Sequence, residues 1–423
     1  MKLGAVVLAA LALAAPAMAS EHHPTLTELE DQLMCPVCTG ETLAQSDSLP
    51  AQRIKAHIQQ RIRQGWTRSE IIREQQDIWG TRILAAPPRH GWNLLAWVLP
   101  HNGRLRWALR AAAIVKPLAP LLAVIGLRRL AAMLALAPAR LPEPPDGAGQ
   151  TLFPAQGQRK GRVALLDGCV TPVIGPSIQE AAIRVLTRHG IEVVLARGQG
   201  CCGGIVHHMG REDAALAGVR RNVEAWTFEL GGEGLDAILI TASGCGTTVK
   251  DYGFMLRTDA AYADAARRVS ALAMDICEYL ARLELPSASA PERLVVAYHA
   301  ACSLQHGQKV VREPKDVLSR LGFVVKDVAE GHLCCGSAGT YNILQPDIAK
   351  RLRARKVGNI EKLAPDVIAA GNVGCITQIA AGTAIPVVHP VELIDWATGG
   401  PRPAALRRIS LTDRSANPAE AVS

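Results

Sequence analysis

The sequence predicts a small all-α head, a three-helix bundle, followed by an α/β body of two duplicated cysteine-rich βαβ domains. Three observations support this fold class. Apolar residues recur at helical spacing over residues 24–86. From residue 162, short apolar strands alternate with helices, a pattern typical of parallel sheets. Within that part, four cysteines recur at a nearly constant offset, which indicates an internal repeat.

Length and composition exclude several classes of protein. The chain has 423 residues, enough for two or three domains. With 49% apolar and 20% charged residues, it is too polar for a multi-span membrane protein and too apolar for a disordered one. A net charge of +8 favours anionic surfaces or acidic substrates. Aromatic residues are only 4% and no basic run is interleaved with them, so no nucleic acid partner is expected.

Residues 1–19 have the features of a secretory signal peptide. Lys2 precedes an apolar stretch, and Ala17-Met18-Ala19 forms an A-x-A cleavage site. Such a segment predicts export to an oxidising compartment, the periplasm.

The head, predicted to span residues 20–100, contains helices that share apolar stripes. Thr67 and Glu70 form a capping box that opens one of these helices. Pro87-Pro88 ends the helical unit at residue 86. The stripes are Leu26, Leu29 and Leu33, and Ile54, Ile58 and Ile62.

Residues 101–161 are predicted to form amphipathic helices and a linker. Residues 91–100 begin like a membrane span, but the apolar run is about half of the roughly 20 residues that a span needs. Charged and proline residues interrupt residues 107–140, so these helices either pack on a domain, which is favoured, or lie at a membrane face. Residues 141–161 are rich in proline and glycine, as linkers are.

The body is predicted to hold two repeats, at residues 162–290 and 291–408, followed by a disordered tail at 409–423. Strands are expected within residues 162–169, 191–196, 236–245, 293–302, 323–328 and 366–375, and helices at 177–190, 211–227 and 346–363.

Four cysteines of the first repeat align with four of the second. The offsets are 133, 133, 133 and 130 residues, from Cys169, Cys201, Cys202 and Cys245 to Cys302, Cys334, Cys335 and Cys375. The first and last of each set end predicted strands, and parallel strands place ligands at their carboxyl ends. Soft thiolates favour iron–sulfur clusters or zinc. Adjacent cysteines fit one tetrahedral zinc poorly, so a cluster is favoured, with zinc and disulfides as the alternatives.

Other candidate residues receive simpler interpretations. Cys277 lies on an apolar helix face and is assigned to the core. His189 precedes a glycine that ends a helix and is assigned a structural role. Four histidines near the cysteines are assigned to solvated loops, with contact to a cluster or cofactor as the alternative; they are His207, His208, His299 and His306.

The body resembles a known family through its cysteine motifs. These are ASGCGTTVKDYG at 242–253, CSLQHGQ at 302–308, GHLCCGSAGTYNILQP at 331–346 and NVGCITQI at 372–379. They are similar to the iron–sulfur subunit of glycolate oxidase, one of a group with cysteine-rich CCG domains, and the resemblance spans roughly residues 103–408. It implies an oxidoreductase subunit with 4Fe-4S-type clusters on the eight aligned cysteines. It also implies a flavoprotein partner that oxidises glycolate, and a cytoplasmic location for the body.

Two features depart from that family. Where the CCG group often has a final C-x-x-C, this chain has Thr248 and Gln378 at the second cysteine position, which limits each site to four thiols. The ferredoxin-like domain of the family, with two C-x-x-C-x-x-C-x-x-x-C-P runs, has no counterpart in this sequence.

Cys35 and Cys38 form a separate C-x-x-C pair in the head. Such a pair is a disulfide, a redox couple or half of a metal site. Zinc would need further ligands, for which His57 is the only candidate, so a redox-active dithiol is favoured. Backbone NH groups at a helix start would stabilise its thiolate.

The head resembles the CcmH/CycL/NrfF group of cytochrome c maturation proteins over about residues 24–100. The family's L-R-C-x-x-C motif becomes Leu33-Met34-Cys35-Pro36-Val37-Cys38, with Met34 in place of arginine. The resemblance implies that the pair reduces or holds the haem-binding thiols of apocytochrome c within a haem lyase assembly, so haem would be involved only through the partner. It also implies a membrane anchor, which here is cut short after Pro100.

Three hypotheses account for the joined segments. The chain is a genuine fusion of a thiol-redox head with an electron-transfer body, a maturation protein with an inert tail, or a glycolate oxidase fragment with a foreign head. Export of the head conflicts with the cytoplasmic location that the resemblance implies for the body.

Overall fold

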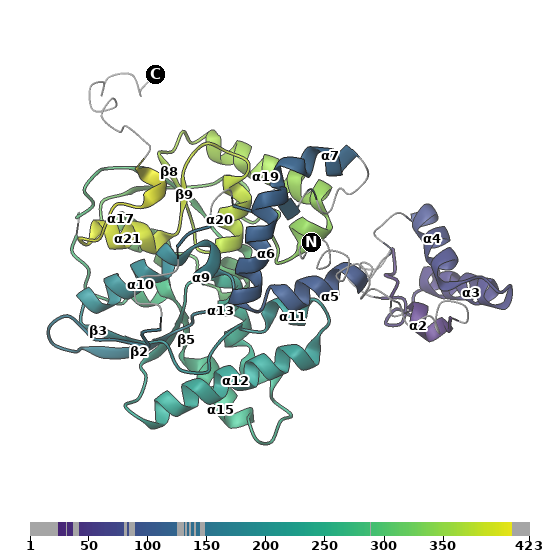
Figure 1. Cartoon of the computed structure of the whole chain (residues 1–423), viewed down its shortest axis with the longest axis horizontal. Helices are drawn as coiled ribbons and strands as arrows, with labels where there is room; N and C mark the ends of the chain where they lie inside the picture. Colours follow the sequence, from purple (N-terminus) through teal and green to yellow (C-terminus); the bar gives the residue numbers. More distant parts are fainter. Residues whose placement is uncertain are drawn as a thin grey trace, which may run out of the picture. The chain divides into compact units, whose positions relative to one another are not determined.

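The computed structural model describes residues 24–30, 32–36, 42–79, 83, 89–124, 131, 133–134, 137–138, 141–143, 149–287 and 289–407. The signal peptide predicted at 1–19 and the tail predicted at 409–423 lie outside these residues. The chain divides into two compact units, Met1–Leu95 and Ala96–Ser423 (Figure 1).

The first unit is helical, as the apolar stripes predict. Its helices are α2 (Leu26–Glu30), α3 (Leu49–Arg63) and α4 (Arg68–Trp79). Both stripes enter one core, in which Leu29, Leu33, Ile54 and Ile58 are buried. The capping box forms: the Thr67 N–H donates to Glu70 Oε2 at 2.8 Å, and the Glu70 N–H donates to Thr67 Oγ1 at 3.3 Å.

Helix α6 (Asn102–Val115) packs on the body of the second unit. Val98, at the end of α5 (Arg89–Val98), and Leu105 of α6 bury against Val173. Arg106 donates to the carbonyls of Pro142 at 3.1 Å and Pro172 at 3.2 Å. For α6, the prediction that these helices pack on a domain is therefore confirmed. Within the described residues, none of the helices is both long and apolar enough to traverse a bilayer.

Two sheets form the body, as the strand–helix alternation predicts. The first has the order β1-β3-β2-β4-β5, in which only β1 is antiparallel. The second has the order β7-β6-β8-β9 and is parallel throughout. The strands are β1 (Leu152–Phe153), β2 (Gly161–Leu165), β3 (Ile191–Val194), β4 (Ala237–Ile240), β5 (Ala273–Asp275), β6 (Val295–His299), β7 (Val324–Asp327), β8 (Val367–Ala370) and β9 (Val387–Val388).

Both sheets are buried on both faces. One face of each contributes to a shared core with α10 (Pro176–Arg188), α16 (Ile276–Leu280), α17 (Glu313–Arg320) and α21 (Pro390–Ala397). The other face of the first sheet packs on α12 (Glu212–Gly231) and α15 (Ala263–Leu272), and that of the second on α19 (Pro346–Glu361). Alternation along β2 explains this, because Val163 and Leu165 enter the shared core while Ala164 faces the outer one.

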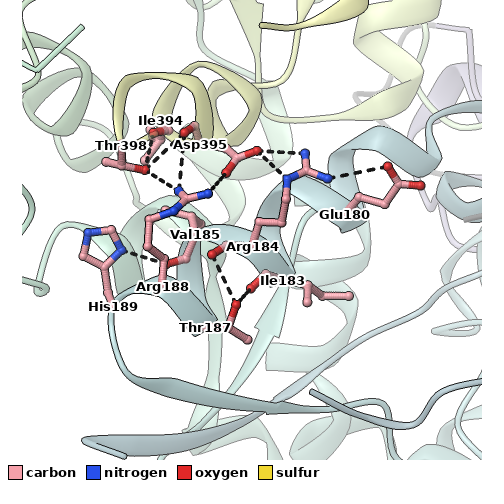
Figure 2. A network of polar contacts seen from close by, with 10 residues as sticks. All are labelled: Glu180, Ile183, Arg184, Val185, Thr187, Arg188, His189, Ile394, Asp395 and Thr398. Atoms are coloured by element: carbon pink, nitrogen blue, oxygen red, sulfur yellow. Dashed lines mark hydrogen bonds and ion pairs between the residues drawn. The ribbon is translucent and has the colours of Figure 1, made fainter. Parts of the chain in front are cut away.

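Helices α10 and α21 join the two halves of the body through a buried carboxylate (Figure 2). Asp395 on α21 accepts from Arg184 Nε at 2.8 Å and from Arg188 Nη2 at 3.0 Å. Arg188 also donates to Thr398 Oγ1 at 2.9 Å. Only 1% of the Asp395 side chain is exposed, so the two guanidinium groups compensate an otherwise unfavourable buried charge.

The structure differs from the predicted strands in two ways. The strands predicted over 236–245 and 366–375 end early, because α13 (Ser243–Lys250) and α20 (Val373–Ala380) begin before their last residues. The edge strands β1, β5 and β9 were not predicted, since runs of two or three residues carry no recognisable period; β1 lies within residues 141–161, which were predicted to be a linker.

Candidate metal sites

The structure gathers the eight aligned cysteines into two groups of four. Cys169, Cys201, Cys202 and Cys245 form the first cysteine set, and Cys302, Cys334, Cys335 and Cys375 form the second. Each set collects the carboxyl ends of three neighbouring parallel strands, β3-β2-β4 in one sheet and β7-β6-β8 in the other. The last cysteine of each set lies in the first turn of a helix, α13 or α20.

Within each set the thiols form a row. In the first, hydrogen bonds connect Cys169 to Cys201, Cys201 to Cys202, and Cys202 to Cys245. In the second, the corresponding connections join Cys302, Cys334, Cys335 and Cys375 in that order. All eight are free, as is Cys277, which contradicts the disulfide alternative for these residues.

Thiols with a lowered pKa occur in both sets. The pKa of Cys201 is lowered because the thiols of Cys169 and Cys202 donate hydrogen bonds to its sulfur. The pKa of Cys334 is lowered in the same way by Cys302 and Cys335. In the second set the pKa of Cys375 is also lowered, to about 6, by hydrogen bonds from Cys335 and then His299. Since the thiolate is the form that binds metals, both sets contain favoured ligands.

The glycine of each Cys-Cys-Gly motif has a steric role. Gly203 and Gly336 have φ values of 85° and 90°, a region that favours glycine. A Cβ on Gly203 would lie 2.9 Å from the carbonyl oxygen of Ala215 on α12, and one on Gly336 would lie 2.5 Å from that of Ala349 on α19. Each glycine therefore lets the cysteine loop approach the helix behind it.

Different residues support the backbone near the two sets. In the first, Asn222 donates to the carbonyl of Cys201 at 3.2 Å, and the Tyr252 hydroxyl donates to that of Cys202 at 2.8 Å. Near the second, the buried Lys356 donates to the carbonyl of Glu330 at 2.8 Å. Burial lowers the pKa of Lys356, while the cysteines of the second set oppose that shift. The sequence interpretation missed Lys356, because a lysine on a helix is most often exposed.

The second set has an additional donor, His299, at the end of β6. This side chain is 1% exposed, and its ring lies with the sulfurs of Cys335 and Cys375 such that all three donor atoms are within 4.8 Å of one another. The assignment of His299 to a solvated loop is therefore wrong. The register of the repeats indicated a buried position, because an offset of 133 pairs His299 with Leu166, a buried apolar residue that directly follows β2.

The other candidate side chains are exposed or structural, as the simpler interpretations expected. His207, His208 and His306 are exposed, but they lie on α11 (Gly204–His208) and η4 (Ser303–Gln308) rather than in loops. His189 Nδ1 donates to the carbonyl of Val185 at 2.7 Å (Figure 2), which is a structural contact. Cys277 is buried in the shared core.

Polar contacts connect the segments that carry the two sets. Ser243 and Ser303 share a hydrogen bond of 2.8 Å between their hydroxyls, and Ser303 directly follows Cys302. Gln308 donates to the Ser243 carbonyl at 2.8 Å. Helix α13, which carries Cys245, thus lies against the π-helical turn η4 (Ser303–Gln308) that follows Cys302.

In the head, Cys35 is 2% exposed and disulfide-bonded. Its sulfur lies 3.7 Å from Ser48 Oγ, the cap of α3. Cys38 lies outside the described residues. His57, the candidate zinc ligand, instead hydrogen-bonds to the Glu74 carboxylate at 3.0 Å, and Arg61 forms an ion pair with the same carboxylate.

Two families match the chain at different places. The family described as "Cytochrome C biogenesis protein" (CcmH) matches residues 3–114, and the one described as "Cysteine-rich domain" (CCG) matches residues 163–250 and 296–380. The chain resembles two families in succession. Both resemblances inferred from the motifs are confirmed, and the second match falls on both cysteine sets.

Relatives of the body include proteins named as iron–sulfur subunits. The "Glycolate oxidase iron-sulfur subunit" of Escherichia coli (strain K12) is 44% identical over 57% of this chain and 59% of its own length. The "Probable glycolate oxidase iron-sulfur subunit" of Bacillus subtilis (strain 168) is 26% identical over 71% of both chains. A fumarate reductase (CoM/CoB) subunit of Methanothermobacter marburgensis is 31% identical over 60% of this chain and 50% of its own. The chain therefore spans little more than half of the first relative.

Proposed function

We propose that the body is an electron-transfer module with an iron–sulfur cluster, of the 4Fe-4S type, on each cysteine set. The observation that carries this proposal is the repeated convergence of four free thiols at the ends of three adjacent parallel strands. A cluster held there would supply one-electron transfer. The names of the E. coli and B. subtilis relatives support the same chemistry.

The thiols fit a cluster better than a single ion. They follow one another in a row, so each sulfur is placed to bind a different metal atom. The N–H groups of Gly204 and Gly336 donate to the sulfurs of Cys202 and Cys334 at 3.4 and 3.3 Å. Such bonds to sulfur tune the potential of a cluster.

By its resemblance to glycolate oxidase subunits, the body would receive electrons from a flavoprotein that oxidises glycolate. The contacts between α13 and η4 support transfer between the two sets, because these segments carry Cys245 or directly follow Cys302. On this proposal the chain is an oxidoreductase subunit that binds no glycolate itself.

The test is iron and acid-labile sulfide analysis with electron paramagnetic resonance, on protein made with and without residues 1–19. Cys202→Ser and Cys335→Ser are each expected to remove about half of the iron, because each variant breaks one set. Cys277→Ala is the matched control and should retain all of it, since Cys277 belongs to neither set. Absence of iron from both forms of the unmodified protein would overturn the proposal.

For the head, we propose that Cys35 and Cys38 form a periplasmic dithiol couple that acts on apocytochrome c thiols, with haem lyase components as partners. The CcmH match and the disulfide-bonded state of Cys35 support this. Cys35→Ser should abolish thiol exchange with a peptide containing the haem-attachment cysteines. Exchange at the unmodified rate would refute the role.

We further propose that the chain is a genuine fusion with the domain boundaries predicted from the sequence, and that the body arose by duplication. The shared strand order, β3-β2-β4-β5 against β7-β6-β8-β9, supports duplication. Three helices around one core support a three-helix bundle for the head. Exposed Leu118, Leu121 and Val124, which follow α6, support membrane association of that part of the segment.

A further inference from the structure

The two cysteine sets differ at one buried position. Strand β6 alternates between the shared core, which Val296 and Tyr298 enter, and the outer core, where Ala297 lies beside Cys335 and Cys375. His299 follows Ala297 by two residues, so it faces the same side. In the first repeat the equivalent residue is Leu166, which packs in the outer core beside Cys202.

The polar atoms of His299 make no contact outside the cysteine set that would give this residue a structural role. Both ring nitrogens are buried and lack a hydrogen-bond partner of normal geometry, and the group that the ring interacts with is the Cys375 thiol, whose pKa it lowers. A buried polar group without a partner is unfavourable, and its retention calls for an explanation such as an ion that satisfies it. By contrast His389, the other buried histidine among the described residues, binds the Thr241 carbonyl at 2.8 Å and accepts from the Val391 N–H at 3.1 Å.

The spacing of the donor atoms suits coordination. The donors of His299, Cys335 and Cys375 lie within 4.8 Å of one another, and no other His, Cys, Asp or Glu trio in the described part of the chain does so. Sulfur and nitrogen ligands at about 2.3 and 2.1 Å from one tetrahedral ion are about 3.5 Å apart. A small side-chain adjustment would therefore place all three on one zinc ion, and on a cluster the same short span would let each donor bind a neighbouring metal atom.

We infer that His299 is a metal ligand of the second cysteine set, which makes this set a mixed thiolate–imidazole site while the first set binds through thiolates alone. The inference deepens the proposed function and rests on it only for the identity of the metal group, because the same donors would bind zinc. A cluster whose ligands include imidazole in place of a thiolate has a higher reduction potential, so with His299 in place of one of its four thiolates the second set would be the more oxidising of the two.

The experiment uses the full chain with selectively ¹⁵N-labelled histidine, reconstituted with iron and sulfide and reduced. Pulsed electron paramagnetic resonance should detect a coupling from a coordinated nitrogen that changes from the ¹⁴N to the ¹⁵N pattern on labelling. The coupling should vanish in His299→Leu, which installs the residue of the first set, and persist in His389→Asn, which removes a buried histidine with other partners. If His299→Leu does not fold, the labelling result on the unmodified chain decides the matter alone.

A second readout uses zinc alone. X-ray absorption at the zinc edge should show nitrogen in the average coordination sphere, and His299→Leu should lose it and bind zinc at the second set about tenfold or more weakly. If clusters assemble without a histidine coupling, the inference is overturned while the proposed function stands. If zinc binds through sulfur only, the inference is overturned, and the iron and sulfide analysis decides the proposed function separately. If no cluster assembles but zinc binds with nitrogen, the proposed function fails and the inference stands.

Discussion

Gly336→Ala is expected to destabilise the second half of the body by about 3 kcal/mol. The left-handed φ of 90° would cost an L-residue about 1–2 kcal/mol. In addition, the new Cβ would lie 2.5 Å from the carbonyl oxygen of Ala349 and 3.2 Å from its Cα. These are backbone atoms of α19, which no side-chain rotation can move away. Overpacking of this kind costs about 1–3 kcal/mol, which gives the sum.

The chain offers a matched control three residues further on. Gly339 also has a positive φ, 63°, but a Cβ there would meet no atom within 4 Å. Gly339→Ala should therefore cost only the conformational part, about 1 kcal/mol. The difference of about 2 kcal/mol corresponds to roughly a 30-fold change in the unfolding equilibrium.

The assay is guanidinium unfolding of the metal-free full chain, followed by circular dichroism, with the midpoints of the two variants compared. Gly336→Ala should unfold at the lower concentration and take up less metal at the second cysteine set, because its loop is displaced. Equal midpoints would refute the reasoning, since they would mean that the approach of the loop to α19 has no energetic cost.

Three further results are expected. Asp395→Ala should lower the free energy of unfolding by about 2 kcal/mol, less than the roughly 3–5 kcal/mol of a fully buried pair, because the Arg184 and Arg188 side chains that lose their partner are 37% and 24% exposed. Asp264→Ala, in an exposed pair, should change it by less than about 0.5 kcal/mol in the same denaturation assay. Burial lowers the pKa of His389 from 6.5 to about 4, so the unfolded chain takes up the proton first as the pH falls. Stability should then decline between about pH 6.5 and 4 by up to about 1.4 kcal/mol per pH unit, and His389→Asn should remove this component; an unchanged pH profile would contradict it. Cys277→Ala should lower the denaturation midpoint, because it leaves a small cavity in the shared core; an unchanged midpoint would refute that packing role.

Much of the architecture could be predicted from the sequence. The strands β2, β3, β6 and β7 and the helices α10, α12 and α19 lie within or close to their predicted ranges, because each has a complete apolar period of its own. The capping box at Thr67 could also be predicted, since its two hydrogen bonds join residues that are only three apart in the sequence. The membership of each cysteine set followed from a repeated spacing, which needs no knowledge of packing.

Only the tertiary structure decided which side chains meet. Whether a histidine near a cysteine is solvated or buried depends on the strand face it occupies, and the register of β6 against β8 placed His299 among sulfurs. Strands β5 and β9 exist because neighbouring strands supply their hydrogen bonds, not because their own residues favour them. The sequence by itself thus determined the elements and the eight cysteines, which local periodicity and spacing encode. Only the fold showed that the two cysteine sets differ. The burial of His299 beside the second set depends on contacts between segments far apart in the chain.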